Sequence, residues 1–175
     1  MIPPQIILLG FKNAGKSTIG TALAKAMQRT FVDLDEEIIL EHSRRSGEKI
    51  SCREIMKKHG EDFFRKLEHD VLHDVLLTKG LIVLALGGGT PMHEANRELL
   101  QKHTIIHITA PKSIVFERIM INGKPAFFPK DEEPFTTFQK LWNEREPVFQ
   151  KLAGMTVENT GSVGEAVEKI IKKLG

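Results

Sequence analysis

The chain has 175 residues, of which 41% are hydrophobic and 27% charged, as in an ordinary globular protein with one sizeable core. A formal net charge of +2 at pH 7 gives no reason to expect nucleic acid or an anionic membrane surface as a partner. The single cysteine, Cys52, excludes an internal disulfide, and no signal peptide or bilayer-spanning run is evident, so we expect a cytosolic protein.

The first predicted element is a strand over residues 5–9, a short apolar and β-branched run. It leads directly into a segment that fits the pattern G-x-x-x-x-G-K-[S/T], namely Gly10-Phe11-Lys12-Asn13-Ala14-Gly15-Lys16-Ser17. Apolar side chains then recur at helical spacing, which predicts a helix over about residues 16–29. A strand, a glycine-rich loop and a helix start are the context in which this pattern forms a phosphate-binding loop.

The chemistry of that loop predicts a nucleoside triphosphate with Mg²⁺. A helix N-terminus has unpaired N–H groups and a partial positive charge, and glycines let the backbone approach phosphate oxygens closely. Lys16 is expected to reach the β- and γ-phosphates, and the Ser17 hydroxyl to ligate the metal ion. The residues expected to bind nucleotide here are Gly10, Asn13, Ala14, Gly15, Lys16, Ser17 and Thr18.

Further along the chain, apolar runs alternate with helical patterns, which predicts βαβ units and a parallel sheet with helices on both faces. The expected strands are residues 30–33, 81–86, 104–108 and 155–157. The expected helices are a segment starting at residue 35, then residues 50–58, 61–77, 94–101, 112–121, 135–152 and 163–174. Residues 43–48 are expected to be a polar loop, and residues 122–134, rich in Gly and Pro, a loop that is mobile or ordered by a ligand.

Two aspartates stand at the end of the second predicted strand, where ligands gather in open parallel sheets. Asp33 is a candidate for the metal ion, and Asp35, two residues on, for a substrate hydroxyl. A turn and a helix cap would use the same residue types at the same positions, so on the residues alone both interpretations stay open.

Several motifs together resemble the shikimate kinase family, and the resemblance covers nearly the whole chain. The motifs are residues 10–18, Phe31-Val32-Asp33-Leu34-Asp35, residues 60–68 with the pattern G-E-x-x-F-R-x-x-E, Gly87-Gly88-Gly89, and Arg145-Glu146-Pro147. The resemblance implies a three-layer α/β/α fold like that of the nucleoside monophosphate kinases, with a five-stranded parallel sheet of order 2-3-1-4-5. It also implies a single kinase domain over residues 1–175, a substrate-binding region at about 34–68 and a mobile lid at about 122–134.

The resemblance implies an enzyme that transfers the γ-phosphoryl group of ATP to the 3-hydroxyl of shikimate in aromatic amino-acid biosynthesis, acting as a monomer. By position, Lys16, Asp35 and Lys124 would be catalytic, and Ser17 and Asp33 would serve the metal ion. The residues implied to contact shikimate are Asp35, Arg65, Gly88, Gly89 and Arg145, with Glu68 holding Arg65. Arg118 and Asn159 correspond loosely to positions that contact the nucleotide's adenine.

One departure from the family lies in the predicted lid, where Lys124 precedes Pro125 and the family has an arginine. The alternatives left open are a kinase for another polyol acid such as gluconate, and a shikimate-binding relic with an impaired lid. A GTP-driven switch is disfavoured because the chain lacks an N-K-x-D motif. Considered alone, the pair Arg65–Glu68 would more often be a surface ion pair, and Gly87–Gly89 a flexible turn.

Overall fold

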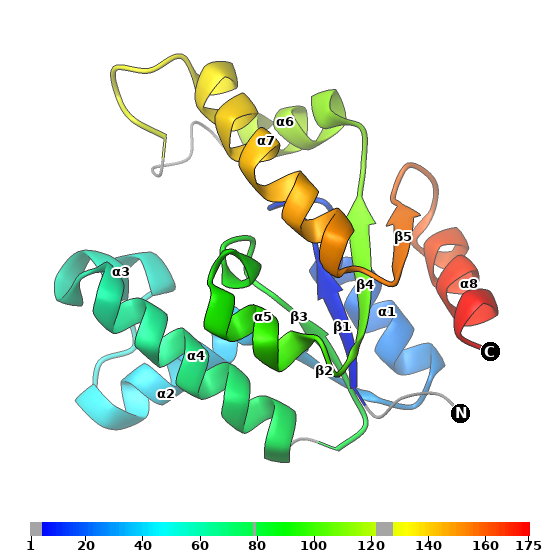
Figure 1. Ribbon diagram of the computed structural model, residues 1–175, viewed down its shortest axis with the longest axis horizontal. Coiled ribbons are helices and arrows are strands. Elements are labelled where there is room, and N and C mark those ends of the chain that lie inside the picture. The colour runs from blue at the N-terminus through cyan, green and yellow to red at the C-terminus, as the bar shows by residue number, and fades with distance from the viewer. Residues whose placement is uncertain (1–4, 79, 122–127) are drawn as a thin grey trace.

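Five parallel strands form the sheet at the centre of the computed structural model, which describes residues 5–78, 80–121 and 128–175. The strands are β1 (Gln5–Leu9), β2 (Thr30–Asp33), β3 (Ile82–Ala85), β4 (Thr104–Thr109) and β5 (Met155–Glu158). Their order across the sheet is β2-β3-β1-β4-β5, with every neighbouring pair parallel, as Figure 1 shows. The predicted fold class and the strand order 2-3-1-4-5 are therefore confirmed.

Alternating side chains of β1 explain why both faces of the sheet are covered. Ile7 and Leu9 belong to one buried cluster, whereas Ile6 and Leu8 belong to a second. Since successive strand residues point to opposite faces, an all-apolar strand requires helices on both sides. β1 lies between β3 and β4, so the loop that follows it begins in the middle of the sheet.

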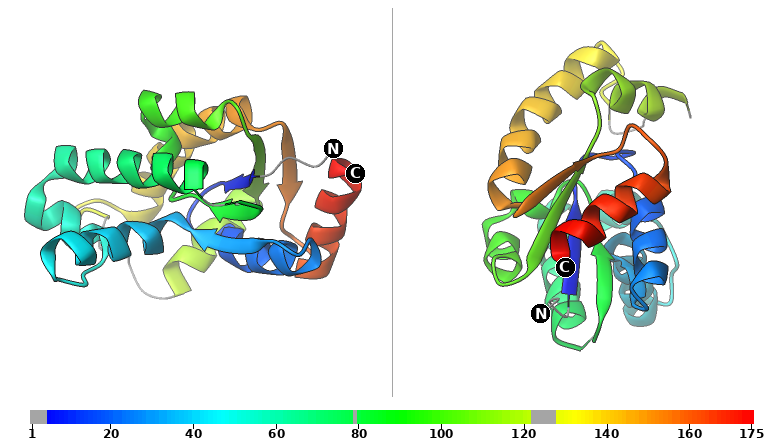
Figure 2. Two further views of the ribbon diagram at one scale, coloured as in Figure 1. Left: turned by 90° about the horizontal axis from the view of Figure 1, so that it is seen from below. Right: turned by 90° about the vertical axis from the view of Figure 1, so that its right-hand side faces the viewer.

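Two helical layers enclose the sheet (Figure 2). One face is covered by α1 (Lys16–Ala26) and α8 (Val163–Leu174), which contribute Ile19, Leu23, Val167 and Ile170 to the same buried cluster as Ile6. The other face is covered mainly by α4 (Glu61–Thr78), α5 (Glu94–Leu100), α6 (Lys112–Ile121) and α7 (Pro134–Leu152). The helices α2 (Leu34–Ser46) and α3 (Cys52–His59) pack beside α4 at one end of the molecule (Figure 1).

Two details differ from the expected elements. The predicted loop at 43–48 is wrong for residues 43–46, because α2 continues to Ser46 and is capped by Gly47, whose φ of 77° suits glycine. A short 3₁₀ helix, η1 (Thr90–Met92), follows the glycine turn and was not expected. Pro147 lies inside α7 without ending it. No helix among the described residues is long and apolar enough to cross a membrane.

Candidate active site

The loop between β1 and α1 folds so tightly that two of its positions require glycine. Gly10 has a φ of 150°, and a Cβ there would lie 2.1 Å from the carbonyl oxygen of Ile108. Gly15, the N-cap of α1, has a φ of 106°, and its Cβ would lie 2.2 Å from Asn159 Nδ2. That same nitrogen donates a hydrogen bond to the carbonyl oxygen of Ala14 at 2.8 Å. The loop is thus fastened to the segment after β5 and leaves the N-terminus of α1 open to an anion.

Lys16 directs its ammonium group back over the loop. Its Nζ donates to the carbonyl oxygens of Gly10 and Phe11, both at 2.9 Å. Burial among the loop atoms lowers the Lys16 pKa to about 8, although the negative charges of Asp35 and Asp33 act in the opposite direction. A cation held at the opening of a helix N-terminus forms, with that helix, a region of positive potential suited to phosphate.

Ser17 and Asp33 bring two oxygen donors together beside the loop. Ser17 Oγ donates to Asp33 Oδ2 at 3.0 Å, and Asp33 Oδ1 accepts from the backbone N–H of Asp35 at 3.0 Å. Asp33 is therefore the N-cap of α2, which confirms the capping interpretation, and its second carboxylate oxygen remains directed toward Ser17. A hydroxyl beside a carboxylate is a donor set that Mg²⁺ accepts when phosphate oxygens supply further ligands, so these residues fit the ion.

Asp35 lies next to this pair, in the first turn of α2. Asp35 as a whole is exposed to solvent, but its carboxylate is crowded by protein atoms. A Cβ on Gly87, for example, would lie 2.9 Å from Asp35 Oδ1. Burial, followed by the charges of Asp33 and Glu68, raises the Asp35 pKa to about 6. The group is ionised at neutral pH yet has more affinity for a proton than an ordinary aspartate, as a general base requires.

Two arginines from distant parts of the chain converge on the glycine turn after β3. A Cβ on Gly88 would lie 3.1 Å from Arg145 Nη1, and one on Gly89 would lie 3.2 Å from Arg65 Nη2. Burial is the main cause that lowers the Arg145 pKa, and the nearby Arg65 lowers it further. Two guanidinium groups on one turn form a site for a carboxylate, which each can bind through paired hydrogen bonds.

Glu68 holds Arg65 from behind. Arg65 Nη1 donates to Glu68 Oε1 at 2.9 Å, while Arg65 Nε lies 3.7 Å from Glu61 Oε1 at the surface. Because Glu68 is only 2% exposed, the interpretation of Arg65–Glu68 as a solvated surface pair is wrong. A buried carboxylate restrains its arginine far more than an exposed one would.

Two of the remaining residues expected to contact the nucleotide, Arg118 and Asn159, lie where the segment after β5 meets the phosphate-binding loop. Arg118 Nη2 donates to the carbonyl oxygen of Asn159 at 3.3 Å, so these two residues lie together and join the loop through Ala14. Thr18 is exposed in the first turn of α1, and Asn13 has a positive φ of 62° within the loop. Residues 122–127 of the expected lid, which include Lys124, lie outside the described residues.

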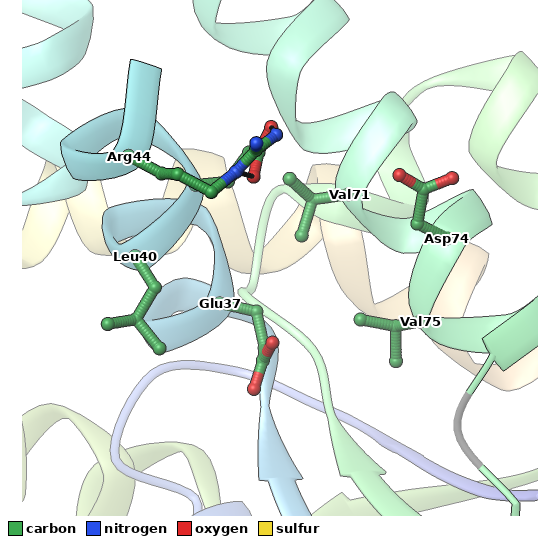
Figure 3. Close-up of a pocket in the computed structure, with 7 residues that line it drawn as sticks. Glu37, Leu40, Arg44, Val71, Asp74 and Val75 are labelled. Carbon is green, nitrogen blue, oxygen red and sulfur yellow. Dashed lines mark hydrogen bonds and ion pairs between the residues drawn. The ribbon is translucent and has the colours of Figure 1, made fainter. Parts of the chain in front are cut away.

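The groove drawn in Figure 3 is not part of this site. It lies between α2 and α4 and is lined by Glu37, Leu40, Glu41, Arg44, Val71, Asp74 and Val75. Glu41 forms salt bridges with Arg44 and Arg45, and Leu40 is 52% exposed. None of these lining residues is among the residues of the phosphate-binding loop, the glycine turn or the two converging arginines.

Thr90 and Asn96 are polar residues of the site region that sequence reasoning missed. Thr90 is fully buried and donates from Oγ1 to Glu68 Oε2 at 2.7 Å, and Asn96 is 1% exposed. A threonine after three glycines and an asparagine in a short helix carry no pattern of their own in the sequence. Only their distance from Glu68 reveals that they belong here.

A phosphate-binding loop on a 2-3-1-4-5 parallel sheet, beside an aspartate and a pair of arginines, defines a P-loop kinase of small molecules. A family model described as shikimate kinase matches residues 12–175. The chain therefore belongs to the shikimate kinase family.

Named relatives agree with this membership over almost the full length of this chain. The chain is 37% identical to a shikimate kinase of Thermus thermophilus, over 97% of this chain and 89% of the relative. It is 34% identical to a shikimate kinase of Nitrosomonas europaea, over 99% of this chain and 79% of the relative.

Among solved structures, a shikimate kinase from Acinetobacter baumannii in complex with shikimate is 30% identical with a TM-score of 0.83, covering 98% of this chain and 93% of that one. A gluconokinase from Sinorhizobium meliloti, 17% identical with a TM-score of 0.62 over 99% and 92% of the two chains, shares the fold alone.

Proposed function

We propose that this protein transfers the γ-phosphoryl group of ATP to the 3-hydroxyl of shikimate, yielding shikimate 3-phosphate and ADP. The observation that carries the proposal is the convergence of Arg65 and Arg145 on the glycine turn, next to Asp35. This arrangement offers a carboxylate site and a proton acceptor on one side of the phosphate-binding loop. The shikimate bound in the Acinetobacter baumannii relative supports the choice of substrate.

The proposed mechanism relies on positioning and charge. Lys16 and the N-terminus of α1 bind the β- and γ-phosphates, and the loop glycines allow the backbone to approach them. Arg65 and Arg145 bind the substrate carboxylate, while Gly88 and Gly89 leave room for the ring beside them. Asp35 orients the attacking hydroxyl and accepts its proton as the oxygen–phosphorus bond forms.

Mg²⁺ is the expected cofactor, and the nearby donors of this chain fit it. Ser17 and Asp33 would hold the ion, because their oxygens lie together beside the phosphate-binding loop. When bound, the ion neutralises charge on the phosphates of ATP. The chain's own contribution is to hold the Ser17 hydroxyl and the Asp33 carboxylate together at 3.0 Å.

We also propose the division of the chain implied by its family: one kinase domain, with a substrate-binding region at about 34–68 and a lid at about 122–134. Asp35 and Arg65 both lie within the first region, which supports its assignment. Lys124 is the proposed lid cation, replacing the family's arginine. The family likewise implies a monomer, and we propose that it acts with ATP and shikimate in the cytosol.

The test measures ADP release from MgATP with shikimate, quinate, gluconate or a nucleoside monophosphate as acceptor. Shikimate should be the preferred acceptor, and Arg65→Ala or Arg145→Ala should weaken its binding by about 2–4 kcal/mol, the scale of a charge-assisted pair. That corresponds to a rise in shikimate KM of roughly 30- to 800-fold with little change in the ATP KM.

A matched control is Arg44→Ala, since Arg44 has a side chain 74% exposed and pairs with Glu41 far from the turn. It should behave as the wild type. Equal turnover with gluconate and shikimate, or arginine variants that leave the shikimate KM unchanged, would contradict the proposed function.

A further inference from the structure

A cluster of polar side chains, three of which are almost fully buried, lies beside the glycine turn. It consists of Glu68 and His69 on α4, Thr90 at the start of η1 and Asn96 on α5; we call it the Glu68 cluster. Glu68 is 2% exposed, Thr90 0% and Asn96 1%. Buried polar groups are costly unless they are hydrogen-bonded, so the contacts inside the cluster determine what it does.

The contacts form a connected network around the Glu68 carboxylate. Thr90 Oγ1 donates to Glu68 Oε2 at 2.7 Å, and Asn96 Nδ2 lies 3.4 Å from Glu68 Oε1. Asn96 Nδ2 also donates to the carbonyl oxygen of Thr90 at 3.0 Å. Asn96 is oriented in turn by His69, whose Nδ1 lies 2.9 Å from Asn96 Oδ1 and donates to it, since that oxygen only accepts.

Thr90 joins this network to the glycine turn through the main chain. It follows Gly89 directly, and its backbone N–H donates to the carbonyl oxygen of Gly87 at 3.2 Å. Glu68 Oε1 accepts from Arg65 Nη1 at 2.9 Å. One residue therefore fixes the turn against which Arg65 packs and also donates to the carboxylate that holds Arg65. Without the hydroxyl, Glu68 Oε2 would lose its donor and the carboxylate could rotate away from the arginine.

We propose that Thr90, supported by Asn96, is a positioning residue that aims Arg65 at the substrate carboxylate. The inference rests on the proposed function, in which Arg65 binds that carboxylate. It assigns to Thr90 an effect on shikimate affinity although its side chain is fully buried. The competing explanation is that the Glu68 cluster only packs α4 against α5, in which case its loss would lower stability without a selective effect on shikimate.

The primary test is Thr90→Val, which keeps the shape of the side chain and removes the hydroxyl. The shikimate KM should rise by about 10- to 150-fold, the scale of one hydrogen bond to a charged group, while the ATP KM changes less than about twofold. Thr90→Ser restores the hydroxyl and should restore the shikimate KM. Thr156→Val, an exposed threonine on β5, is the matched control and should match the wild type.

A double-variant cycle separates positioning from packing. If Thr90 acts through Arg65, then Thr90→Val should add almost nothing to the shikimate KM of Arg65→Ala. Additive effects, or equal rises in the shikimate and ATP KM, would overturn the inference. If Thr90→Val does not fold, Asn96→Ala replaces it in the double-variant cycle with Arg65→Ala. The expected rise in the shikimate KM is then smaller.

The failures of the two proposals can be told apart. If Arg65→Ala itself leaves the shikimate KM unchanged, the proposed role of Arg65 fails and the inference about Thr90 falls with it. If Arg65→Ala raises the shikimate KM but neither Thr90→Val nor Asn96→Ala does, only the inference is overturned.

Discussion

Activity should fall in mildly acidic solution because Asp35 takes up a proton. Burial, Asp33 and Glu68 raise the pKa of this carboxyl from 3.8 to about 6, while Lys16 and Lys12 partly offset the shift. The ionised form is the proposed base. Since the pKa is raised, that form is present above about pH 6 and is lost as the pH falls through this value, well before an ordinary aspartate would be protonated.

The size of the effect follows from the same value. With a pKa of about 6, roughly 97% of Asp35 is ionised at pH 7.5 and only about 9% at pH 5, so kcat/KM for shikimate should fall about tenfold. A carboxyl with a pKa of 3.8 would still be about 94% ionised at pH 5, and activity would hardly change. At pH 5, the ionised fraction of Asp35, and with it the expected kcat/KM, therefore differs about tenfold between the two pKa values.

The assay is kcat/KM for shikimate between pH 5 and 8 with saturating MgATP, since this ratio reports groups of the enzyme before shikimate binds. Asp35→Asn should lower kcat by about 10²-fold or more and remove the acidic limb, so any limb that remains belongs to the substrates. Lys12→Ala should move the midpoint upward, because Lys12 lowers the Asp35 pKa. Circular dichroism at pH 5 checks that the chain stays folded. A midpoint near pH 4, or an unchanged limb in Asp35→Asn, would refute the assignment.

Two further substitutions test other parts of the molecule. Lys16→Ala should abolish phosphoryl transfer with an unaltered thermal transition, because it removes the cation set at the phosphates; near wild-type turnover would contradict the phosphate-loop assignment. Glu146→Ala should lower the free energy of unfolding by about 1–3 kcal/mol, because it truncates a side chain that is almost fully buried and removes the carboxylate whose Oε2 lies 3.4 Å from Nε2 of the buried His107. Urea unfolding of this variant and of the double variant His107→Leu/Glu146→Leu measures the effect: the double variant should lie close to the wild type, and a loss below about 1 kcal/mol in the single variant would count against the argument.

The sheet and the phosphate-binding loop could be predicted because their signals are local. Residues 5–9 form an apolar run too short for a helix that leads directly into the glycine loop, and a fully buried strand has little other choice. The glycines at positions 10 and 15 have the positive φ angles that the loop requires. Each of these inferences needs only a few adjacent residues.

The polar segment at 43–46 shows where local signals mislead. Its residues Ser43-Arg44-Arg45-Ser46 favour a loop by composition, yet the helix continues through them. Glu41 pairs with Arg44 and Arg45 at helical spacings of three and four residues, and the chain ends the helix at the left-handed Gly47. A solvated helix face and a polar loop have the same composition, so composition alone does not locate the end of the helix. The helix-stop signal at Gly47 does.

The substrate side of the site could be predicted only in part. Arg65, Gly88, Gly89 and Arg145 were assigned through the resemblance, because no local pattern states that positions 80 residues apart will meet. Thr90 had no pattern at all, since its role depends on the packing of η1 against α4. Asp33 and Asp35 were ambiguous between cap and site, and the structure makes Asp33 a cap whose second oxygen faces Ser17.

Glu68 links the two halves of the proposed chemistry. Its negative charge is among the causes that raise the Asp35 pKa, and its oxygen Oε1 accepts from Arg65. A neutral residue at this position would leave Asp35 a weaker base and Arg65 without its holder. The buried hydroxyl of Thr90 donates to Glu68 Oε2 at 2.7 Å and so holds this carboxylate in place. The same hydrogen bond therefore fixes the carboxylate that orients Arg65 toward the substrate carboxylate. It also fixes a negative charge that raises the pKa of Asp35, the proposed base for the substrate hydroxyl.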